Sequence, residues 1–238
     1  HGAAEHRLFI GQVPVQDSRP EAARSGELHY RILHENPAAL RAGLADWIEQ
    51  PEPVEGGVAF SLRAYPVAAE PAAYARHRAA SFLIDYTEPV IQALAGLIEQ
   101  RYGAQPSAGQ LEQFVYDYIV DKNSAHGFDV ASMVARSRAG DCTEHAVLLT
   151  ALLRMYGYPA RTVIGLYVSL EEPVLAYGHA WAEYYSADGW TGLDGTRLGN
   201  SVGAQHVPLG LVEDESIGYA LGLIGIFQML AIDRVIVE

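Results

Sequence analysis

The amino-acid sequence predicts an α+β fold in which helices pack on an antiparallel sheet, with a small β-containing extension at the N-terminal end. Apolar residues recur at helical spacing between about residues 88 and 156, and strand-like alternation follows between about residues 160 and 194. Helices that come first, followed by a run of strands, are typical of an α+β domain rather than of alternating βαβ units. Two alternating segments before residue 66 indicate the extension.

The N-terminal part shows two kinds of sequence. The first 25 residues are polar and rich in Ala, Pro and Arg, and we expect them to form an extended arm. Residues 28–33 and 57–65 alternate between polar and apolar positions and are predicted strands, with a short helix over 37–50 between them. This part is therefore expected to be a small β-containing unit.

The chain of 238 residues is long enough for one large domain or for a core with a small appendage. The stretch from Pro66 to Pro71 follows the second predicted strand, and we expect it to be a linker between two parts of the chain. We therefore predict an arm and a small β unit over residues 1–66 and a larger core over residues 67–238.

The larger part carries five predicted helices and four predicted strands. Gly103 ends the first of these helices, and Ser107 with Gln110 forms a capping box that starts the second. The helices cover residues 88–102, 107–119, 129–136, 142–156 and about 219–230, and the strands cover residues 161–169, 180–185, 190–193 and 233–237.

Composition and charge exclude several classes of protein. Half of the residues are apolar and 19% are charged, which is a globular balance. Asp and Glu number 29 against 16 Lys and Arg, for a formal charge of −13, so we expect no nucleic-acid partner and no anionic membrane surface as a partner. The single cysteine excludes an internal disulfide and a multi-thiolate zinc site.

Two features bear on processing and membranes. The sequence starts at His1 without an initiator Met or a signal peptide, from which we expect a processed or truncated form. The longest apolar stretch, residues 217–232, is interrupted by Gln228 and three glycines and is shorter than the roughly 18 to 20 apolar residues of a membrane span. We therefore expect a buried element there and no membrane insertion.

One segment combines a helix start with a nucleophile. Gly140 ends the preceding helix, Asp141 is a good N-cap residue, and Cys142 falls on the first turn. Residues 146–153 are all apolar or Thr, so we expect a helix that is buried on every side, with only its start and Cys142 exposed. Backbone N–H groups and the helix dipole at that start favour a thiolate, and we expect a Cys142 pKa below the free value of about 8.5. A buried core cysteine is the alternative.

A second segment supplies a histidine and an aspartate. Two predicted strands flank a turn at Asp188-Gly189. A four-residue loop would place His179 opposite Asp194, whereas a two-residue loop at that dipeptide would place Asp194 opposite Glu183. The first register brings a carboxylate beside the imidazole, which fixes the tautomer of the ring and stabilises its charged form. An ordinary hairpin with a chance His–Asp pair is the alternative.

Taken together, the two segments resemble the transglutaminase-like superfamily. Gly140-Asp141-Cys142 at the start of an apolar helix resembles the nucleophile segment of that family, and its extension through Thr143-Glu144-His145-Ala146 resembles a bacterial subgroup. The run from Tyr156 to Val163 is similar to the family's Gly-x-Pro-Ala-Arg step into the sheet.

The histidine and aspartate motifs complete the resemblance. His179-Ala180-Trp181 with Glu183 is similar to the histidine strand of the family, and Asp194-Gly195-Thr196 to its aspartate motif, in which Pro or Ala more often fills the middle position. The likeness covers about residues 111–196, and its three parts occur in the family's order. It implies a papain-like core in which tertiary folding brings Cys142 next to His179, with Asp194 orienting that base.

The resemblance also implies a reaction. Thiolate attack on an amide carbonyl releases an amine or ammonia and leaves a thioester, which an amine or water then resolves. The backbone N–H of Cys142 would be one oxyanion donor, and no sequence motif identifies the second. The substrate would be a protein or peptide, no cofactor is implied, and relatives that act outside the cytoplasm suggest a periplasmic or secreted location.

Several neighbouring residues receive lesser roles. His145 lies one turn from Cys142 and could support the site or face the substrate. A two-ligand Cys-x-x-His pair makes a poor metal site and no oxygen-rich calcium loop is present, so no metal is expected. Glu144 is read as an ordinary first-turn carboxylate. Glu183 could line the cleft, but a surface ion pair is the default interpretation. His206 gives no signal in the sequence.

Trp181 is expected to pack beside His179. In the register that pairs His179 with Asp194, Trp181 faces Gly192, whose missing side chain would leave room for the indole.

The sequence thus predicts a cysteine-dependent enzyme that acts on amide bonds through Cys142, His179 and Asp194. Hydrolysis and amine transfer use the same thioester and stay open, with protease or amidase activity favoured over protein cross-linking. A binding or scaffold module on the same fold, without activity, is the alternative from a different class. Oligomeric state and substrate identity are not predicted.

Overall fold

The computed structural model describes residues 10–18, 26–48, 50–63, 75–123, 129–199, 202–212 and 231–238. Its helices are α2 (Pro37–Leu44), η4 (Arg76–Arg78, a short 3-10 turn), α3 (Pro89–Tyr102), α4 (Ala108–Tyr118), α5 (Ala131–Ser137) and α6 (Cys142–Met155). Its strands are β1 (Ile10–Asp17), β2 (Glu27–His34), β3 (Glu52–Val54), β4 (Gly57–Arg63), β5 (Ala160–Ser169), β6 (Leu175–Ser186), β7 (Gly189–Leu193), β8 (His206–Leu211) and β9 (Ile232–Val237). The helix predicted over residues 219–230 lies outside the described residues.

Local signals place the helices close to where the sequence predicts them. Gly103, with a φ of 86°, ends α3, and the predicted capping box of Ser107 and Gln110 starts α4 with both of its hydrogen bonds formed. The predicted helix over residues 37–50 is shorter than expected, because α2 ends at Leu44. No helix among the described residues is long and apolar enough to cross a membrane.

The strands form one sheet that crosses the predicted domain boundary. Its order is β3-β4-β2-β9-β1-β6-β5-β8, and β7 pairs with β6 beside this path. Neighbouring strands are antiparallel except for β1 and β9, which pair in parallel. Strand β9, from the C-terminal end, lies between β2 and β1, so both predicted parts contribute to the same sheet. The boundary between residues 66 and 67 itself stays a prediction.

Three strands that the sequence did not reveal all contain proline: Pro14 in β1, Pro53 in β3 and Pro208 in β8. Proline lacks the N–H group of a strand ladder and is tolerated mainly at edges. Strands β3 and β8 end the described sheet, and Pro14 comes just before Val15, where pairing with β9 begins. The expectation of an extended arm is therefore wrong for residues 10–17, which lie inside the sheet.

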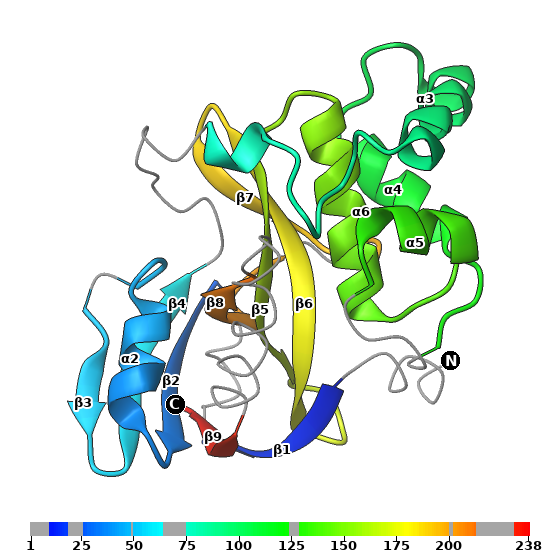
Figure 1. Cartoon of the computed structure of the whole chain (residues 1–238). Helices are drawn as coiled ribbons and strands as arrows, with labels where there is room; N and C mark the ends of the chain where they lie inside the picture. Colours follow the sequence, from blue (N-terminus) through cyan, green and yellow to red (C-terminus); the bar gives the residue numbers. More distant parts are fainter. Residues whose placement is uncertain are drawn as a thin grey trace.

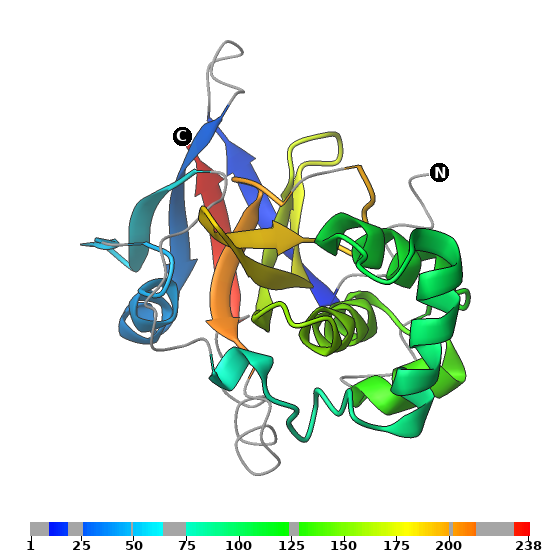
Figure 2. The same cartoon turned by 90° about the horizontal axis from the view of Figure 1, so that it is seen from above.

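The sheet separates two apolar cores, as α+β packing requires. Figure 1 shows α3 to α6 on one side of β6, and α2 with β2 to β4 on the other; Figure 2 shows the same division from above. Alternate residues of the central strands enter different cores: Ile164 and Ala180 face the α3–α6 core, whereas Val163 and Trp181 join the core that includes α2. The predicted fold class is confirmed.

Candidate active site

The start of α6 is capped as the sequence predicts, but it is not exposed. The Asp141 side chain accepts from the Thr143 N–H at 3.0 Å, and the Glu144 side chain accepts from the Asp141 N–H at 3.0 Å, which completes a capping box. Cys142 has an exposed fraction of 0%, and the next three residues are buried as well. The prediction of an exposed helix start is wrong, because the first turn also packs into the interior.

Position 140 requires a glycine, because the Glu144 side chain occupies the space that a Cβ there would need. The glycine has a φ of +145°, and a Cβ there would lie 2.3 Å from the Glu144 Cβ. Glu144 also accepts from the Thr143 hydroxyl at 2.9 Å and from the Asp129 N–H at 3.2 Å. Glu144 therefore ties the incoming chain to the helix start, a larger role than the favourable dipole contact that its position predicts.

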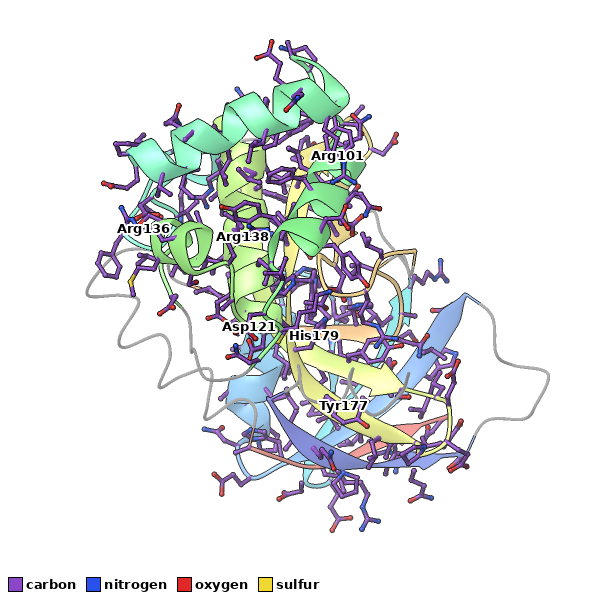
Figure 3. The ribbon with its side chains drawn as sticks, turned by 90° about the vertical axis from the view of Figure 1, so that its right-hand side faces the viewer. Arg101, Asp121, Arg136, Arg138, Tyr177 and His179 are labelled. Atoms are coloured by element: carbon purple, nitrogen blue, oxygen red, sulfur yellow. The ribbon has the colours of Figure 1, made fainter. Side chains whose placement is uncertain are left out.

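A gap on one edge of β6 receives the cysteine. One edge of β6 pairs with β5 over residues 175–184. On the other edge, β1 pairs with residues 175–178 and β7 with residues 182–186, so among the described strands none pairs with residues 179–181 there. The Cys142 sulfur accepts a hydrogen bond from the N–H of Ala180, in this gap. Cys142 thus reaches the backbone directly beside His179, which Figure 3 shows on β6.

Asp194 reaches the same gap, although both expected hairpin registers are wrong. The observed hairpin pairs Ser186 with Gly189 and continues to Ala182 opposite Leu193. The two-residue turn is held by the Ser186 hydroxyl, which accepts from the Asp188 N–H at 3.2 Å. Asp194 follows the last paired residue of β7 and reaches His179 diagonally, with 2.8 Å between the His179 Nε2 and the Asp194 Oδ2.

The register also changes which glycine accommodates Trp181. Gly192 pairs with Glu183, and a Cβ at Gly192 would meet Val202 at 2.5 Å. Gly165 is the residue that makes room for the indole, because a Cβ there would lie 2.8 Å from the Trp181 ring. Trp181 itself is fully buried and its ring centroid lies 6.2 Å from that of His179, so the predicted packing of the indole beside the histidine is confirmed.

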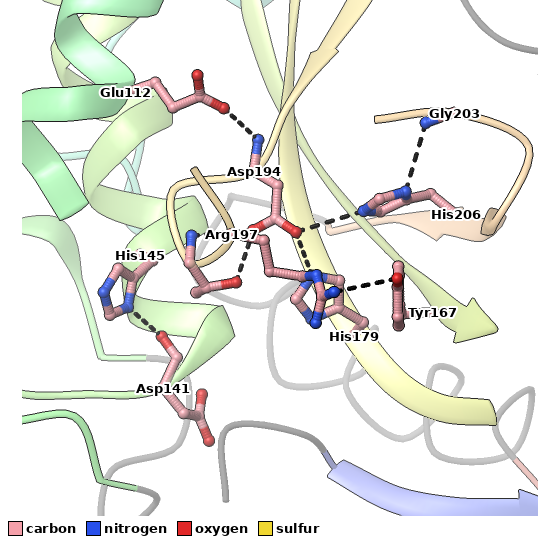
Figure 4. Close-up of polar contacts among 10 residues, drawn as sticks. Glu112, Asp141, His145, Tyr167, His179, Asp194, Arg197, Gly203 and His206 are labelled. Carbon is pink, nitrogen blue, oxygen red and sulfur yellow. Dashed lines mark hydrogen bonds and ion pairs between the residues drawn. The ribbon is translucent and has the colours of Figure 1, made fainter. Parts of the chain in front are cut away.

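Asp194 is the centre of a buried hydrogen-bond network (Figure 4). Its Oδ2 accepts from the His179 Nε2 at 2.8 Å and lies 3.3 Å from the His206 Nε2. Its Oδ1 accepts from the Thr196 N–H at 2.9 Å and from the Thr196 hydroxyl at 2.6 Å. Its backbone N–H donates to Glu112 at 2.8 Å. Besides His179, which the sequence predicts beside Asp194, only Thr196 could have been found from sequence, because an Asp side chain often bonds the backbone N–H two residues on.

Aromatic rings enclose the two histidines. The Tyr167 ring stands edge-on to both, with centroid distances of 6.2 Å to His179 and 5.1 Å to His206. Arg197 lies over Tyr167, with its guanidinium carbon 4.1 Å from the ring centroid, and donates to the Tyr167 hydroxyl at 3.1 Å. The exposed fractions of His179, Asp194 and His206 are between 1% and 2%. Water therefore has little access to the imidazoles.

Burial gives the cysteine and the aspartate opposite pKa shifts. Burial raises the pKa of Cys142 well above its ordinary value, and the carboxylate of Asp141 raises it further. The expected depression by the helix dipole is therefore wrong for this conformation. Burial would also raise the pKa of Asp194, but His179 and His206 outweigh it and hold that pKa well below the usual range. The resting site thus pairs a neutral thiol with an ionised carboxylate.

Glu112 and His145 lie beside this network and have shifted pKa values. Burial, followed by the charge of Asp194, raises the pKa of Glu112 to about 7. Burial lowers the pKa of His145 to about 4, so its ring is neutral, and its Nδ1 lies 2.6 Å from the carbonyl oxygen of Asp141. His145 therefore supports the loop at the start of α6, and Figure 4 shows this contact apart from the Asp194 network.

Glu183 is not the surface residue that the sequence suggests. Its side chain has an exposed fraction of 0%, and its Oε2 lies 2.5 Å from the Arg161 Nε. The Trp47 Nε1 donates to the other carboxylate oxygen at 2.8 Å. The ion pair is therefore buried, and it links β5 and β6 to the segment that follows α2.

His179, Asp194 and His206 also form the one group of potential metal ligands found among the described residues. Their ligand atoms lie within 4.8 Å of one another. The His206 Nδ1 faces the Gly203 N–H at 3.4 Å and accepts from it, so the His206 Nε2 carries the ring proton. A protonated Nε2 cannot bind a metal, and the geometry fits a hydrogen-bond network better than a metal site.

Comparison with protein families gives one match. Residues 97–195 match the family model described as the transglutaminase-like superfamily. The matched region contains Cys142, His179 and Asp194 but ends before His206. Comparison with curated proteins gives no match.

Comparison with solved structures finds similar folds. A candidate cysteine protease from Cytophaga hutchinsonii is 18% identical, with a TM-score of 0.52, and 82% of each chain is covered. The periplasmic domain of TgpA from Pseudomonas aeruginosa is 23% identical, with a TM-score of 0.41, over 58% of this chain and 52% of that one. LapG from Legionella pneumophila is 12% identical, with a TM-score of 0.39, over 69% of this chain and 100% of that one. The match to the transglutaminase-like superfamily thus covers residues 97–195, which carry Cys142, His179 and Asp194.

Proposed function

We propose that the protein is a cysteine-dependent enzyme that hydrolyses or transfers the acyl group of protein or peptide amides, with Cys142 as nucleophile, His179 as base and Asp194 orienting the base. The observation that carries this proposal is the convergence on the β6 gap. The Cys142 sulfur contacts the N–H of Ala180, the residue after His179, and His179 is bonded to Asp194 at 2.8 Å. A thiol near a histidine that a carboxylate orients is a recurring arrangement in nucleophilic catalysis.

The hydrogen bonds assign the tautomer of the base. Because Asp194 is ionised, the His179 Nε2 that faces it must carry the ring proton. The His179 Nδ1 is then the nitrogen left to accept the Cys142 proton. Since burial raises the pKa of Cys142, the thiolate forms together with the imidazolium during reaction with a substrate rather than beforehand.

The reaction then proceeds in two halves. The Cys142 thiol proton moves to His179 as the sulfur attacks the carbonyl carbon, and the carbonyl electron pair moves to the oxygen. Collapse of this adduct breaks the C–N bond, and the leaving amine takes the proton from His179. Water or a second amine, deprotonated by His179, attacks the thioester and releases an acid or a new amide, and the sulfur regains its proton.

The start of α6 offers one oxyanion donor. Asp141 caps the N–H groups of Thr143 and Glu144, which are the second and third helical residues. The N–H of Cys142 is the first, and we assign it to the oxyanion, in line with donors at other helix starts. A second donor is not assigned.

The enclosure of the sulfur favours a second candidate, a binding or scaffold module that uses this fold without catalysis. Cys142 is 0% exposed and its pKa is raised, which are properties of a structural cysteine. For catalysis, the residues around the sulfur must move apart to admit a substrate. The two candidates therefore differ in whether Cys142 reacts at all.

A periplasmic or secreted location, expected for an enzyme of this kind, stays a prediction.

A peptide library read by mass spectrometry separates these candidates. Wild type and Cys142→Ala are incubated with the library, with and without a primary amine and in heavy-oxygen water. Hydrolysis introduces heavy oxygen into a new carboxyl group, whereas transfer adds the mass of the amine. Asp194→Asn should lower the rate on the order of 10³-fold to 10⁴-fold, as it does when the tautomer of a triad histidine is lost. Equal product from wild type and Cys142→Ala on every substrate would favour the silent module.

A further inference from the structure

His206 is a buried histidine that the proposed reaction does not use. It begins β8, and its Nε2 lies 3.3 Å from the Asp194 Oδ2, the same oxygen that bonds His179. It lies beyond residues 97–195, the region that matches the family model. The family resemblance therefore assigns it no role.

The surroundings of His206 make it a hydrogen-bond donor to Asp194. The Gly203 N–H lies 3.4 Å from the His206 Nδ1 and donates to it, so the ring proton resides on Nε2. The backbone of His206 is held by a hydrogen bond from its N–H to the Gly203 carbonyl at 2.8 Å and by its pairing with Tyr167 on β5. The Trp181 ring packs on it with a centroid distance of 5.4 Å. The ring has a fixed tautomer and a fixed position.

His206 fills the last hydrogen-bond acceptor position of the Asp194 carboxylate. An ionised carboxylate offers about four lone-pair positions. Thr196 fills two on Oδ1 with its N–H and hydroxyl, and His179 and His206 fill one each on Oδ2. With the His206 position filled, the carboxylate cannot rotate or slide along the His179 ring without breaking a buried hydrogen bond.

We propose that His206 is a positioning residue, which donates its Nε2–H to Asp194 and thereby fixes the direction from which that carboxylate holds His179. The proposal rests on the proposed function in so far as the positioned His179 is the base. His206 acts only through Asp194.

The kinetic test compares two substitutions at His206 with a matched control. His206→Leu removes the donor, and His206→Gln places an amide N–H near the same point. His34→Leu is the control, because His34 is also buried, lies on β2 and has its Nδ1 engaged by the Asn36 N–H at 2.8 Å. We expect His206→Leu to lower kcat by roughly tenfold or more with KM little changed, as for loss of one hydrogen bond to a charged group. His206→Gln should recover most of kcat, and His34→Leu should lower stability without lowering kcat.

A spectroscopic test does not depend on activity. In protein labelled with ¹⁵N-histidine, long-range ¹H–¹⁵N spectra should show the His206 ring protonated at Nε2 and not at Nδ1. The His179 Nε2–H should exchange with water roughly tenfold faster in His206→Leu than in wild type or His206→Gln, because its acceptor is no longer fixed. If no substrate is found, the function proposal fails while this measurement still decides the role of His206.

Three results would overturn the inference. The first is a His206 ring protonated at Nδ1. The second is a failure of either substitution to behave as expected. The His206→Leu variant would then have the kcat and the His179 Nε2–H exchange rate of wild type, or the His206→Gln variant would have a kcat no higher than that of His206→Leu. The third is stoichiometric zinc in the purified protein that is lost in His206→Leu, since the cluster would then be a metal site.

Discussion

The buried ion pair between Arg161 and Glu183 gives the sharpest prediction about stability. The Glu183 side chain has an exposed fraction of 0% and that of Arg161 10%, with 2.5 Å between the Arg161 Nε and the Glu183 Oε2. Arg161 also lies over Trp190, with 4.2 Å from the guanidinium carbon to the ring centroid, and the Trp47 Nε1 donates to Glu183 at 2.8 Å. The perturbation is Glu183→Gln, which keeps an acceptor for Trp47 and removes only the charge.

The magnitude follows from the burial of Arg161. Without the carboxylate, the guanidinium is an uncompensated charge in the interior, and removing one partner of a buried pair typically costs about 3–5 kcal/mol. For a chain of this size, about 2–4 °C of Tm is lost per kcal/mol, so Tm should fall by about 6–20 °C.

Urea unfolding followed by far-ultraviolet circular dichroism measures this cost. The matched control is Asp117→Asn, because the Arg101–Asp117 pair has a comparable distance of 2.6 Å but exposed fractions of 46% and 36%. The control should lose at most about 1 kcal/mol of unfolding free energy. Arg161→Met in the Glu183→Gln background removes the unpaired charge and should recover most of the loss. A cost for Glu183→Gln equal to that of the control, or no recovery in the double variant, would refute the reasoning.

Three further predictions concern the thiol, the pH dependence of stability and the sheet. Native Cys142 should react with iodoacetamide at pH 7 roughly tenfold or more slowly than a free thiol, because it is 0% exposed and burial raises its pKa; rapid labelling with a midpoint below pH 8.5 would contradict this. The pKa of Glu112 is raised from 4.5 to about 7, so its contribution to stability is full below pH 4.5 and is lost as pH rises through 7. The Tm of Glu112→Gln relative to wild type should therefore rise between pH 5 and pH 8, and parallel Tm profiles would show that Glu112 does not titrate there. Gly165→Ala should lower the unfolding free energy by about 1–3 kcal/mol, because its Cβ would lie 2.0 Å from the Val207 carbonyl oxygen; unchanged urea unfolding would show that β8 moves aside at no cost.

The parts of the fold that the sequence predicts well depend on local interactions. The start of α6 at Cys142 and the start of α4 after Ser107 follow from capping bonds between residues within three positions of each other. The end of α3 at Gly103 follows from a single backbone conformation. The uninterrupted run of apolar residues and Thr over positions 146–153 likewise indicates that this part of α6 is buried on all sides, because no face of the helix is charged.

The strands that contain proline were not predicted. Whether a strand can contain proline depends on which strands pair with it, and those strands are distant in sequence. Pro14 fits within β1 only because pairing with β9 starts one residue later. Pro208 fits in β8 because that strand is at an edge of the described sheet. Nothing in the local sequence shows where an edge will lie, and alternation interrupted by proline predicts a loop.

The candidate site likewise has features that the sequence predicts and features that only the folded chain shows. The types of its three principal residues, Cys142, His179 and Asp194, are evident from motifs, but their environment comes from contacts made by the folded chain. The sequence suggested an exposed thiol with a lowered pKa, whereas packing against β6 buries the sulfur and raises that pKa. His206 enters only because β8 pairs with β5, beside the strand that carries His179.

The sequence by itself determined helices α3 to α6, the presence of a hairpin and the residue types proposed for catalysis, because capping, periodicity and turn chemistry act over a few residues. Only the tertiary structure decided the hairpin register, the gap in β6 that Cys142 enters, and the hydrogen bonds that hold Asp194. The physical reason is that burial and hydrogen bonding are set by whichever elements pack together, and those elements come from all parts of the chain.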